Sequence, residues 1–273
     1  MGRDVPSDFA EGRASQDLPP GIFLLFASDK RPKRLDVMNA IEDSQSASIS
    51  HDPSMIPLDR EAEGGRGATA HAGDWVEILQ WGMTFDLLGI APGPGVRLPD
   101  IGYRFGCAVN VPDSHTGAMA LVPGPHLIDG ANSLPIVRAM LDLASHLAQT
   151  LPQVEAVCWS PARSAIGAPL FSRTVAAWLS GGPFPALGLA GFAQQQGGRL
   201  VSEGLSYFVG QELSLTPELA ANPVAATQLG ARLVHEIVGT GRVEEARSFI
   251  TDTGISLMLS PLDDGVTVEV SPM

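Results

Sequence analysis

The order of strand-like and helix-like segments in the second half of the chain restricts the fold more than any other feature. From residue 154 onward, short apolar runs typical of strands alternate with amphipathic segments typical of helices, as strand, helix, strand, strand, helix and strand. Two more strand-like runs, separated by the turn Asp263-Asp264-Gly265, follow. Hairpins mixed with helices argue against a doubly wound parallel sheet. The sequence therefore predicts an α+β fold with mixed, mostly antiparallel sheets and helices packed on one side, in the ferredoxin-like β-α-β-β-α-β order.

Boundary signals define several of these elements. A helix is expected after Ser133, with Pro135 in its first turn, and another begins with the cap pair Asn222-Pro223. Strands are predicted at residues 21–27, 101–111, 118–122, 154–160, 186–192, 205–215, 247–252, 255–260 and 266–270, and helices at residues 34–42, 133–149, 170–179 and 223–238.

Composition divides the chain into three regions. Residues 1–20 are polar and without periodicity, which predicts a disordered tail. Residues 21–116 are expected to form an N-terminal α+β region that contains a flexible linker at about 43–70, rich in Ser, Asp, Glu and Gly. Residues 117–273 are expected to form a C-terminal α+β domain.

The charge balance restricts the partners. There are 30 acidic and 17 basic residues, with a formal net charge of -13, and Lys occurs only as Lys30 and Lys33. Nucleic-acid binding depends on many contacts from Lys and Arg to phosphates, so no nucleic-acid partner is expected. An acidic surface favours association with another protein, in particular a basic one. The oligomeric state does not follow from the sequence.

The location of the protein is predicted to be the cytoplasm. The N-terminus has no signal-peptide pattern, and the uncharged stretch 174–198 contains Gly181-Gly182-Pro183-Phe184-Pro185, which would break a membrane-spanning helix. The two cysteines, Cys107 and Cys158, form no disulfide framework and are interpreted as buried thiols.

Searches for signatures of catalysis and cofactor binding give a negative expectation. Neither lysine follows a glycine-rich loop, so there is no P-loop for phosphates. His235-Glu236 begins like a zinc-binding H-E-x-x-H motif, but Gly239 stands where the second imidazole would be. No G-x-S-x-G nucleophile elbow occurs. We therefore predict no cofactor, no metal and no assigned catalytic residue, and leave enzymatic activity open while favouring its absence.

One group of candidate binding residues lies in loops near predicted strand ends. His126 and Asp129, together with Asp113 and His115, have side chains suited to metal binding or acid–base chemistry. The alternative is that loops contain such residues by chance, since the sequence fixes none of their distances.

A second group follows the strand predicted at 154–160. Trp159 and Ser160 end this strand, and Arg163 lies in the next loop, where it and the amides of the following helix could hold a small anion. A purely structural turn is the alternative. Glu212 lies in an otherwise apolar strand. Its carboxylate is either buried, and then paired or raised in pKa, or exposed at a sheet edge, which is the simpler explanation.

Three segments resemble the bacterial DUF4261 family, a family without an assigned activity. They are Val157-Cys158-Trp159-Ser160, Phe184-Pro185-Ala186-Leu187 and the stretch 202–215, in which Gly204-Leu205 and Glu212-Leu213 fit the family pattern. Val209 and Ser214 depart from it, the latter where a second Glu is common. The resemblance covers roughly residues 118–270. The same pattern is more distantly similar to Suppressor-of-fused-like domains, which include immunity proteins of bacterial toxin systems.

These observations predict a soluble bacterial protein that acts without catalysis by binding another protein, as an immunity-like or accessory factor. The alternative is a hydrolase or small-ligand-binding enzyme that uses the strand-end residues, which requires at least three of them to converge on one cleft.

Overall fold

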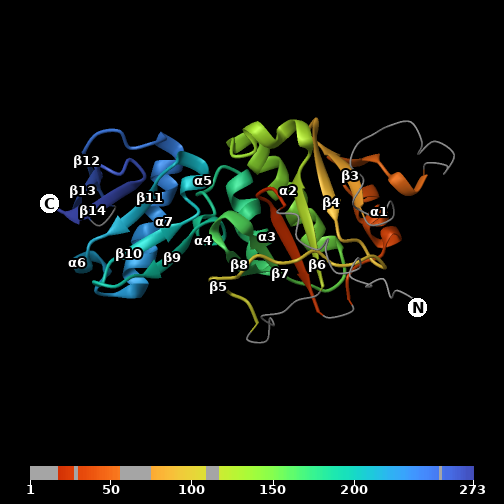
Figure 1. Cartoon of the computed structure of the whole chain (residues 1–273), viewed down its shortest axis with the longest axis horizontal. Coiled ribbons are helices and arrows are strands. Elements are labelled where there is room, and N and C mark those ends of the chain that lie inside the picture. Colours follow the sequence, from red (N-terminus) through yellow and green to blue (C-terminus); the bar gives the residue numbers. More distant parts are fainter. Residues whose placement is uncertain (1–17, 28–29, 56–74, 109–116, 252–253) are drawn as a thin grey trace, which may run out of the picture.

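The structure is a computed structural model that describes residues 18–27, 30–55, 75–108, 117–251 and 254–273. Within these residues, two β-sheets lie side by side along the long axis of the molecule, and helices pack against both (Figure 1). The predicted α+β class with mixed, mostly antiparallel sheets is therefore confirmed.

The larger sheet has the most apolar strand of the chain at its centre. All five residues of β1 are buried, because helices cover one face of this strand and a second apolar layer covers the other. Antiparallel pairing predominates, and among the described strands of this sheet only β5 and β8 run parallel. In spatial order the sheet contains β2 (Ala47–His51), β3 (Trp75–Gln80), β4 (Met83–Leu88), β6 (Ala118–Pro123), β1 (Ile22–Phe26), β7 (Val154–Trp159), β8 (Ser164–Gly167) and β5 (Tyr103–Phe105).

Helices α1 (Arg34–Glu42), α2 (Leu134–Thr150) and α3 (Ala168–Leu179) cover one face of this sheet. The predicted helix at 133–149 is confirmed as α2, with Pro135 in its first turn. Ser133 has extended backbone at the N-cap position, although its side chain makes no capping bond. The apolar residues at helical spacing on α2 are buried against β1 and β6.

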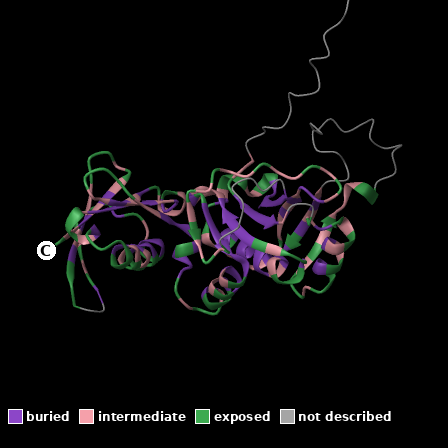
Figure 2. Ribbon diagram, turned by 90° about the horizontal axis from the view of Figure 1, so that it is seen from below, coloured by how far each residue is buried: buried purple, intermediate pink, exposed green. Residues whose placement is uncertain are grey.

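The opposite face of the larger sheet carries a second, smaller apolar cluster. Phe23 and Leu25 of β1 pack there with Val122 and Cys158, and the segment that contains Val96 lies against them. Figure 2 shows that buried residues are concentrated in these central strands. Both faces of the larger sheet are therefore covered at its central strands, whereas at β3 the second face carries the half-buried Glu77 and the exposed Leu79.

The smaller sheet is covered on one face only by the elements that the structure describes. Helix α7 (Pro223–Thr240) begins where the Asn222 side chain accepts bonds from the backbone N–H groups of Val224 and Ala225, as predicted, and with α6 (Pro217–Ala220) it covers the apolar face. The other face carries Ser248, Met258 and other half-buried or exposed side chains. In spatial order this sheet contains β12 (Arg247–Ile250), β13 (Ser256–Pro261), β14 (Thr267–Pro272), β11 (Glu212–Leu215), β10 (Leu200–Glu203) and β9 (Gly191–Gln194).

The ferredoxin-like order is not confirmed. β7 belongs to the larger sheet and β9 to β14 to the smaller one, so the predicted strands do not share a sheet. The larger sheet contains strands from both sides of residue 117, and the sheets separate between Gly167 and Gly191 instead. A single apolar core nevertheless extends through both.

Several predicted elements differ from the structure. Residues 47–51, predicted as linker, form β2. The rest of the predicted linker from residue 56, and residues 1–17 of the predicted tail, lie outside the described residues.

The predicted strand 186–192 begins instead as the short helix α4 (Ala186–Leu189), because a short apolar run does not distinguish a buried helical turn from a strand. The predicted strand 205–215 contains the short helix α5 (Ser206–Val209), which ends at Gly210 in the left-handed conformation. Strand β5 is also shorter than the predicted strand 101–111, of which residues 109–111 lie outside the description.

Three 3₁₀ turns complete the description: η1 (Pro53–Met55), η3 (Pro125–Gly130) and η4 (Ser160–Ala162). In the part of the chain that the structure describes, no helix combines the length and the apolar character that a membrane span needs.

Candidate functional site

The strongest grouping of predicted site residues lies where the two sheets meet, in a region that we call the junction. It consists of residues 159–163, which begin with the last residue of β7, and residues 203–206, which begin with the last residue of β10, together with Tyr103 of β5 and Glu212 of β11. At residue 204 the two loops approach so closely that a Cβ atom would lie 2.5 Å from the Cβ of Ala162, which excludes any side chain there. Gly204 also has a φ of +100°, so glycine is required at this position.

Ser160 ties the end of β7 to the beginning of β1. Its Oγ accepts a hydrogen bond from the backbone N–H of Gly21 at 2.9 Å and donates to the carbonyl oxygen of the same residue at 3.1 Å. A serine nucleophile needs a neighbouring base that takes its proton. Here the hydroxyl proton faces a backbone carbonyl, so Ser160 acts as a structural link between two strands.

Arg163 spans the junction through an ion pair. Its Nε lies 2.7 Å from Oε1 of Glu203, and its second terminal nitrogen lies 3.3 Å from Oε2, which is a bidentate geometry. The Tyr103 hydroxyl donates to the same carboxylate at 2.8 Å. Burial, and then the hydrogen bond with Glu203, raise the pKa of Tyr103 to about 12, so its hydroxyl keeps its proton at neutral pH.

The anion site predicted around Arg163 therefore has an internal occupant. The Glu203 carboxylate takes the position beside the guanidinium that an external anion would need. Strand β8 also separates Arg163 from α3, so the amides of the following helix are not next to it, as the sequence suggested.

Glu212 is held by a concave set of donors. Its carboxylate accepts hydrogen bonds from the backbone N–H groups of Gly204 at 2.8 Å and Ser206 at 3.0 Å, and from the Ser202 hydroxyl at 2.5 Å. The N–H of Leu205 contributes a longer bond of 3.3 Å. The carboxylate is paired, as one predicted alternative had it, but it is half-buried rather than buried. The edge alternative is wrong, because β11 lies inside the sheet between β14 and β10. Glu212 thus fixes the loop that crosses the junction.

Trp159 forms the apolar floor of the junction. Its ring is 2% exposed and contacts Tyr207 edge-on at 5.2 Å and Phe208 in a stacked arrangement at 6.2 Å. The indole Nε1 and the Tyr207 hydroxyl are both buried without a protein hydrogen-bond partner. Burial raises the pKa of Tyr207 to about 12. The packing of these aromatic rings connects the end of β7 to α5 and thereby holds the two sheets together.

The other two predicted residues lie elsewhere. His126 and Asp129 are exposed on η3, which follows β6, and their predicted partners Asp113 and His115 lie outside the described residues. β6, which precedes His126, and β7, which precedes Ser160, end on either side of the beginning of β1. The surroundings of these two residues nevertheless differ. His126 lies near Asp86 of β4, whereas Ser160 contacts Gly21.

Asp86 belongs to a polar group that the sequence did not suggest. It stands directly opposite Glu77 across β3 and β4. Burial, and then the charge of Glu77, raise the pKa of Asp86 to about 6, while His126 and His51 act in the opposite direction. Only the pairing of β3 with β4 brings the two carboxylates together, so no signal along the chain could have revealed them.

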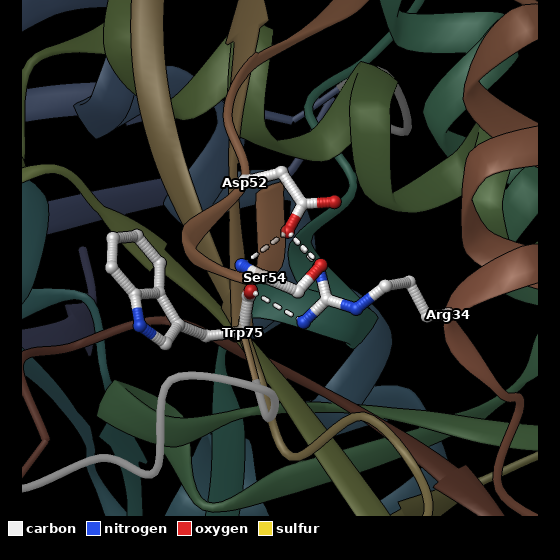
Figure 3. Close-up of polar contacts among 4 residues, drawn as sticks. All are labelled: Arg34, Asp52, Ser54 and Trp75. Carbon is white, nitrogen blue, oxygen red and sulfur yellow. Dashed lines mark hydrogen bonds and ion pairs between the residues drawn. The ribbon is translucent and has the colours of Figure 1, made fainter. Parts of the chain in front are cut away.

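A partly buried ion pair anchors α1 beside the same strands (Figure 3). Arg34 pairs with Asp52, which also accepts bonds from the backbone and hydroxyl of Ser54 at 2.9 and 2.7 Å, and Arg34 donates to the carbonyl of Trp75. Burial alone would raise the pKa of Asp52, but the bonds from Ser54 and Arg34 outweigh it and lower the pKa. The group joins α1, the end of β2 and the start of β3.

Metal and thiol chemistry gain no support from the described residues. None of their His, Cys, Asp and Glu side chains form a cluster of three or more that could hold a metal ion. Burial raises the pKa of the Cys158 thiol to about 12 and also raises that of Cys107, which leaves both as thiols at neutral pH.

Comparison with known proteins gives no match to any protein-family model, curated protein or solved structure.

The junction therefore unites Trp159, Ser160, Arg163 and Glu212, and it adds Glu203 and Tyr103, which sequence analysis missed. Every one of these polar side chains except the Trp159 indole is hydrogen-bonded within the protein. Chemically, the arrangement holds two sheets in a fixed relation.

Proposed function

We propose that this chain is a non-enzymatic bacterial protein-binding module, an immunity-like or accessory factor, whose partner docks on the smaller sheet. The membership in the DUF4261 family that the sequence suggests is part of this proposal. One observation carries it: the charged groups Arg163, Glu203 and Glu212 of the junction are bonded within the protein, while the smaller sheet has a face that no described element covers.

The uncovered face has the composition of a contact surface. Along β12, β13 and β14 it presents Ser248, Met258 and Ser271 in one row, small hydroxyl groups around a flexible apolar side chain. Ile250 and Met273 on the same side are 67% and 70% exposed. Methionine adapts to irregular partner surfaces, and exposed apolar side chains gathered in one place mark interaction sites.

The test is capture of a partner by the tagged full chain from a bacterial lysate at low salt. We expect a protein retained in near-stoichiometric amount and lost with the variant Met258→Glu, which places a charge on the uncovered face. The matched control is Leu35→Glu, which changes an apolar side chain of α1 that is 67% exposed. A chain that retains no protein, or one whose partner is retained equally by Met258→Glu, contradicts the proposal.

A further inference from the structure

Among the strands that the structure describes, β12 forms one outer edge of the smaller sheet and is paired only with β13. The N–H of Thr251 donates to the carbonyl of Ile255, which marks a hydrogen-bonded pair of this antiparallel ladder. Because such pairs alternate with non-bonded ones, Phe249 and Arg247 direct their backbone groups toward β13. The N–H and C=O groups of Ser248 and Ile250 therefore point away from the sheet, where an added strand would find them.

The surroundings of this edge favour an extended ligand. Ile250 is 67% exposed, and outer strands with free backbone groups and exposed apolar side chains pair readily with another chain. A recess of about 340 Å³ lies beside the start of the strand. It is lined by Thr240, Arg242, Val243, Glu244, Glu245, Ala246 and Arg247.

Four charged side chains line the recess, the acidic Glu244 and Glu245 and the basic Arg242 and Arg247. Glu244 and Glu245 are exposed, and within the described residues their carboxylates make no hydrogen bond or ion pair. Arg242 donates to the carbonyls of Gly210 and Gly265 and so brings the turn that contains Asp263 close to this segment. Arg247 bonds to Thr240 and lies 3.7 Å from Glu236, so its positive charge already faces a carboxylate of this protein. The guanidinium of Arg242 is held by the two carbonyl oxygens.

We propose that β12 binds an extended, basic segment of another protein by strand addition, with Glu244 and Glu245 contacting its Lys or Arg side chains. The inference rests on the proposed function and names the surface and the chemistry of the partner. Backbone bonds to Ser248 and Ile250 supply affinity, and the two carboxylates supply selectivity. The net charge of -13 opposes pairing of two copies of this chain along the same edge.

The test uses a phage-displayed library of random peptides selected on the full chain at low salt. We expect the recovered peptides to be enriched in Lys and Arg, and to bind less tightly as salt is added. The variant Ser248→Pro removes one outward N–H without affecting the ladder to β13, and we expect it to weaken binding at least about tenfold, the value of one good hydrogen bond. Replacing both carboxylates, as Glu244→Gln with Glu245→Gln, is expected to weaken binding and to abolish the preference for basic peptides.

A matched control exists at the opposite edge of the same sheet. The N–H of Gln195 donates to the carbonyl of Arg199, so the backbone of Gln194 on β9 also points outward. Gln194→Pro therefore makes the same chemical change on the other outer strand and is expected to leave peptide binding unchanged. Circular dichroism of both proline variants verifies that the fold is retained.

Three results would overturn the assignment to β12: selection that recovers no basic peptides, peptides that bind Ser248→Pro as tightly as the parent, or a dimer in sedimentation analysis that Ser248→Pro converts to a monomer. The last result would show that a second copy occupies the edge. If the lysate partner is still lost with Met258→Glu in any of these cases, the proposed function stands and only the edge assignment fails. If no partner is retained either, both fail.

Discussion

The two sheets of this molecule differ in how far their faces are covered by other elements. The central strands of the larger one are enclosed, with helices on one face and a second apolar cluster around Phe23 and Leu25 on the other. The smaller one has α7 on one face and half-exposed serines and Met258 on the other. A sheet covered on both faces has no surface left for a partner, whereas a sheet covered on one face does. The difference separates a supporting region from a region suited to binding.

The largest predicted effect tests this difference directly. Leu25→Ala removes a fully buried side chain from the second face of the larger sheet, and we expect it to lower the free energy of unfolding by about 3 kcal/mol. Met258→Ala is the corresponding change on the smaller sheet and is expected to cost below about 1 kcal/mol. Urea denaturation measures both. Equal losses would show that the face around Met258 is covered as well.

A second prediction concerns the polar anchor of the smaller sheet. Glu212→Gln replaces one carboxylate oxygen with an amide that faces N–H donors, and we expect a loss of about 2 kcal/mol. Glu218→Gln on the exposed surface of α6 is the matched control and should change stability by less than about 0.5 kcal/mol. Thermal unfolding followed by circular dichroism distinguishes them, and a neutral Glu212→Gln would contradict the structural role of this side chain.

A third prediction concerns the two carboxylates of Asp86 and Glu77, which face each other across β3 and β4 of the larger sheet. The pKa of Asp86 is raised from 3.8 to about 6, so the folded state binds a proton that the unfolded state releases, and stability falls as pH rises from about 4 to 6. The full difference corresponds to about 3 kcal/mol, which screening of this half-buried group reduces to about 1 kcal/mol.

Asp86→Asn should therefore raise the free energy of unfolding by about 1 kcal/mol at pH 7 and leave it nearly unchanged below pH ~4, where the aspartate is protonated. Denaturation curves at the two pH values provide the measurement. The exposed Asp129→Asn serves as the control, and a gain for Asp86→Asn of equal size at both pH values would rule out the titration of Asp86 as its cause.

The smallest predicted effect concerns the link between the two sheets. Arg163 and Glu203 are 45% and 33% exposed, so a double-mutant cycle with Arg163→Ala and Glu203→Ala should give a coupling energy of about 0.5 kcal/mol that shrinks at high salt. A coupling of zero at low salt would mean that the aromatic contacts of Trp159 hold the junction without help from the ion pair.

Sequence patterns predicted the individual helices and strands better than they predicted which strands pair with one another. The amphipathic spacing of α2, the Asn222-Pro223 cap and the apolar run of β1 all predicted their elements, because each signal lies within a few neighbouring residues. The sheet to which a strand belongs depends on contacts far along the chain, so the predicted ferredoxin-like order did not foresee that β7 pairs with β1. The short helices α4 and α5 lie within segments that were predicted as strands, because buried helical turns and buried strands share the same composition.

The candidate site shows the same limit. Trp159, Ser160, Arg163 and Glu212 were selected for separate reasons, and the structure brings them together. Glu203 and Tyr103 escaped notice because each is ordinary among its neighbours, and their positions 100 residues apart give no pattern. The internal hydrogen bonds of these groups follow from tertiary packing alone.

The central position of β1 has a consequence for biosynthesis. Leu24 pairs with Met119 on one side and Val157 on the other, partners that leave the ribosome long after it. Until then the nascent chain carries an entirely apolar five-residue strand without neighbours, a state that is slow to resolve and prone to aggregation. Production of this protein in a heterologous host is therefore expected to depend on chaperone capacity and on growth temperature.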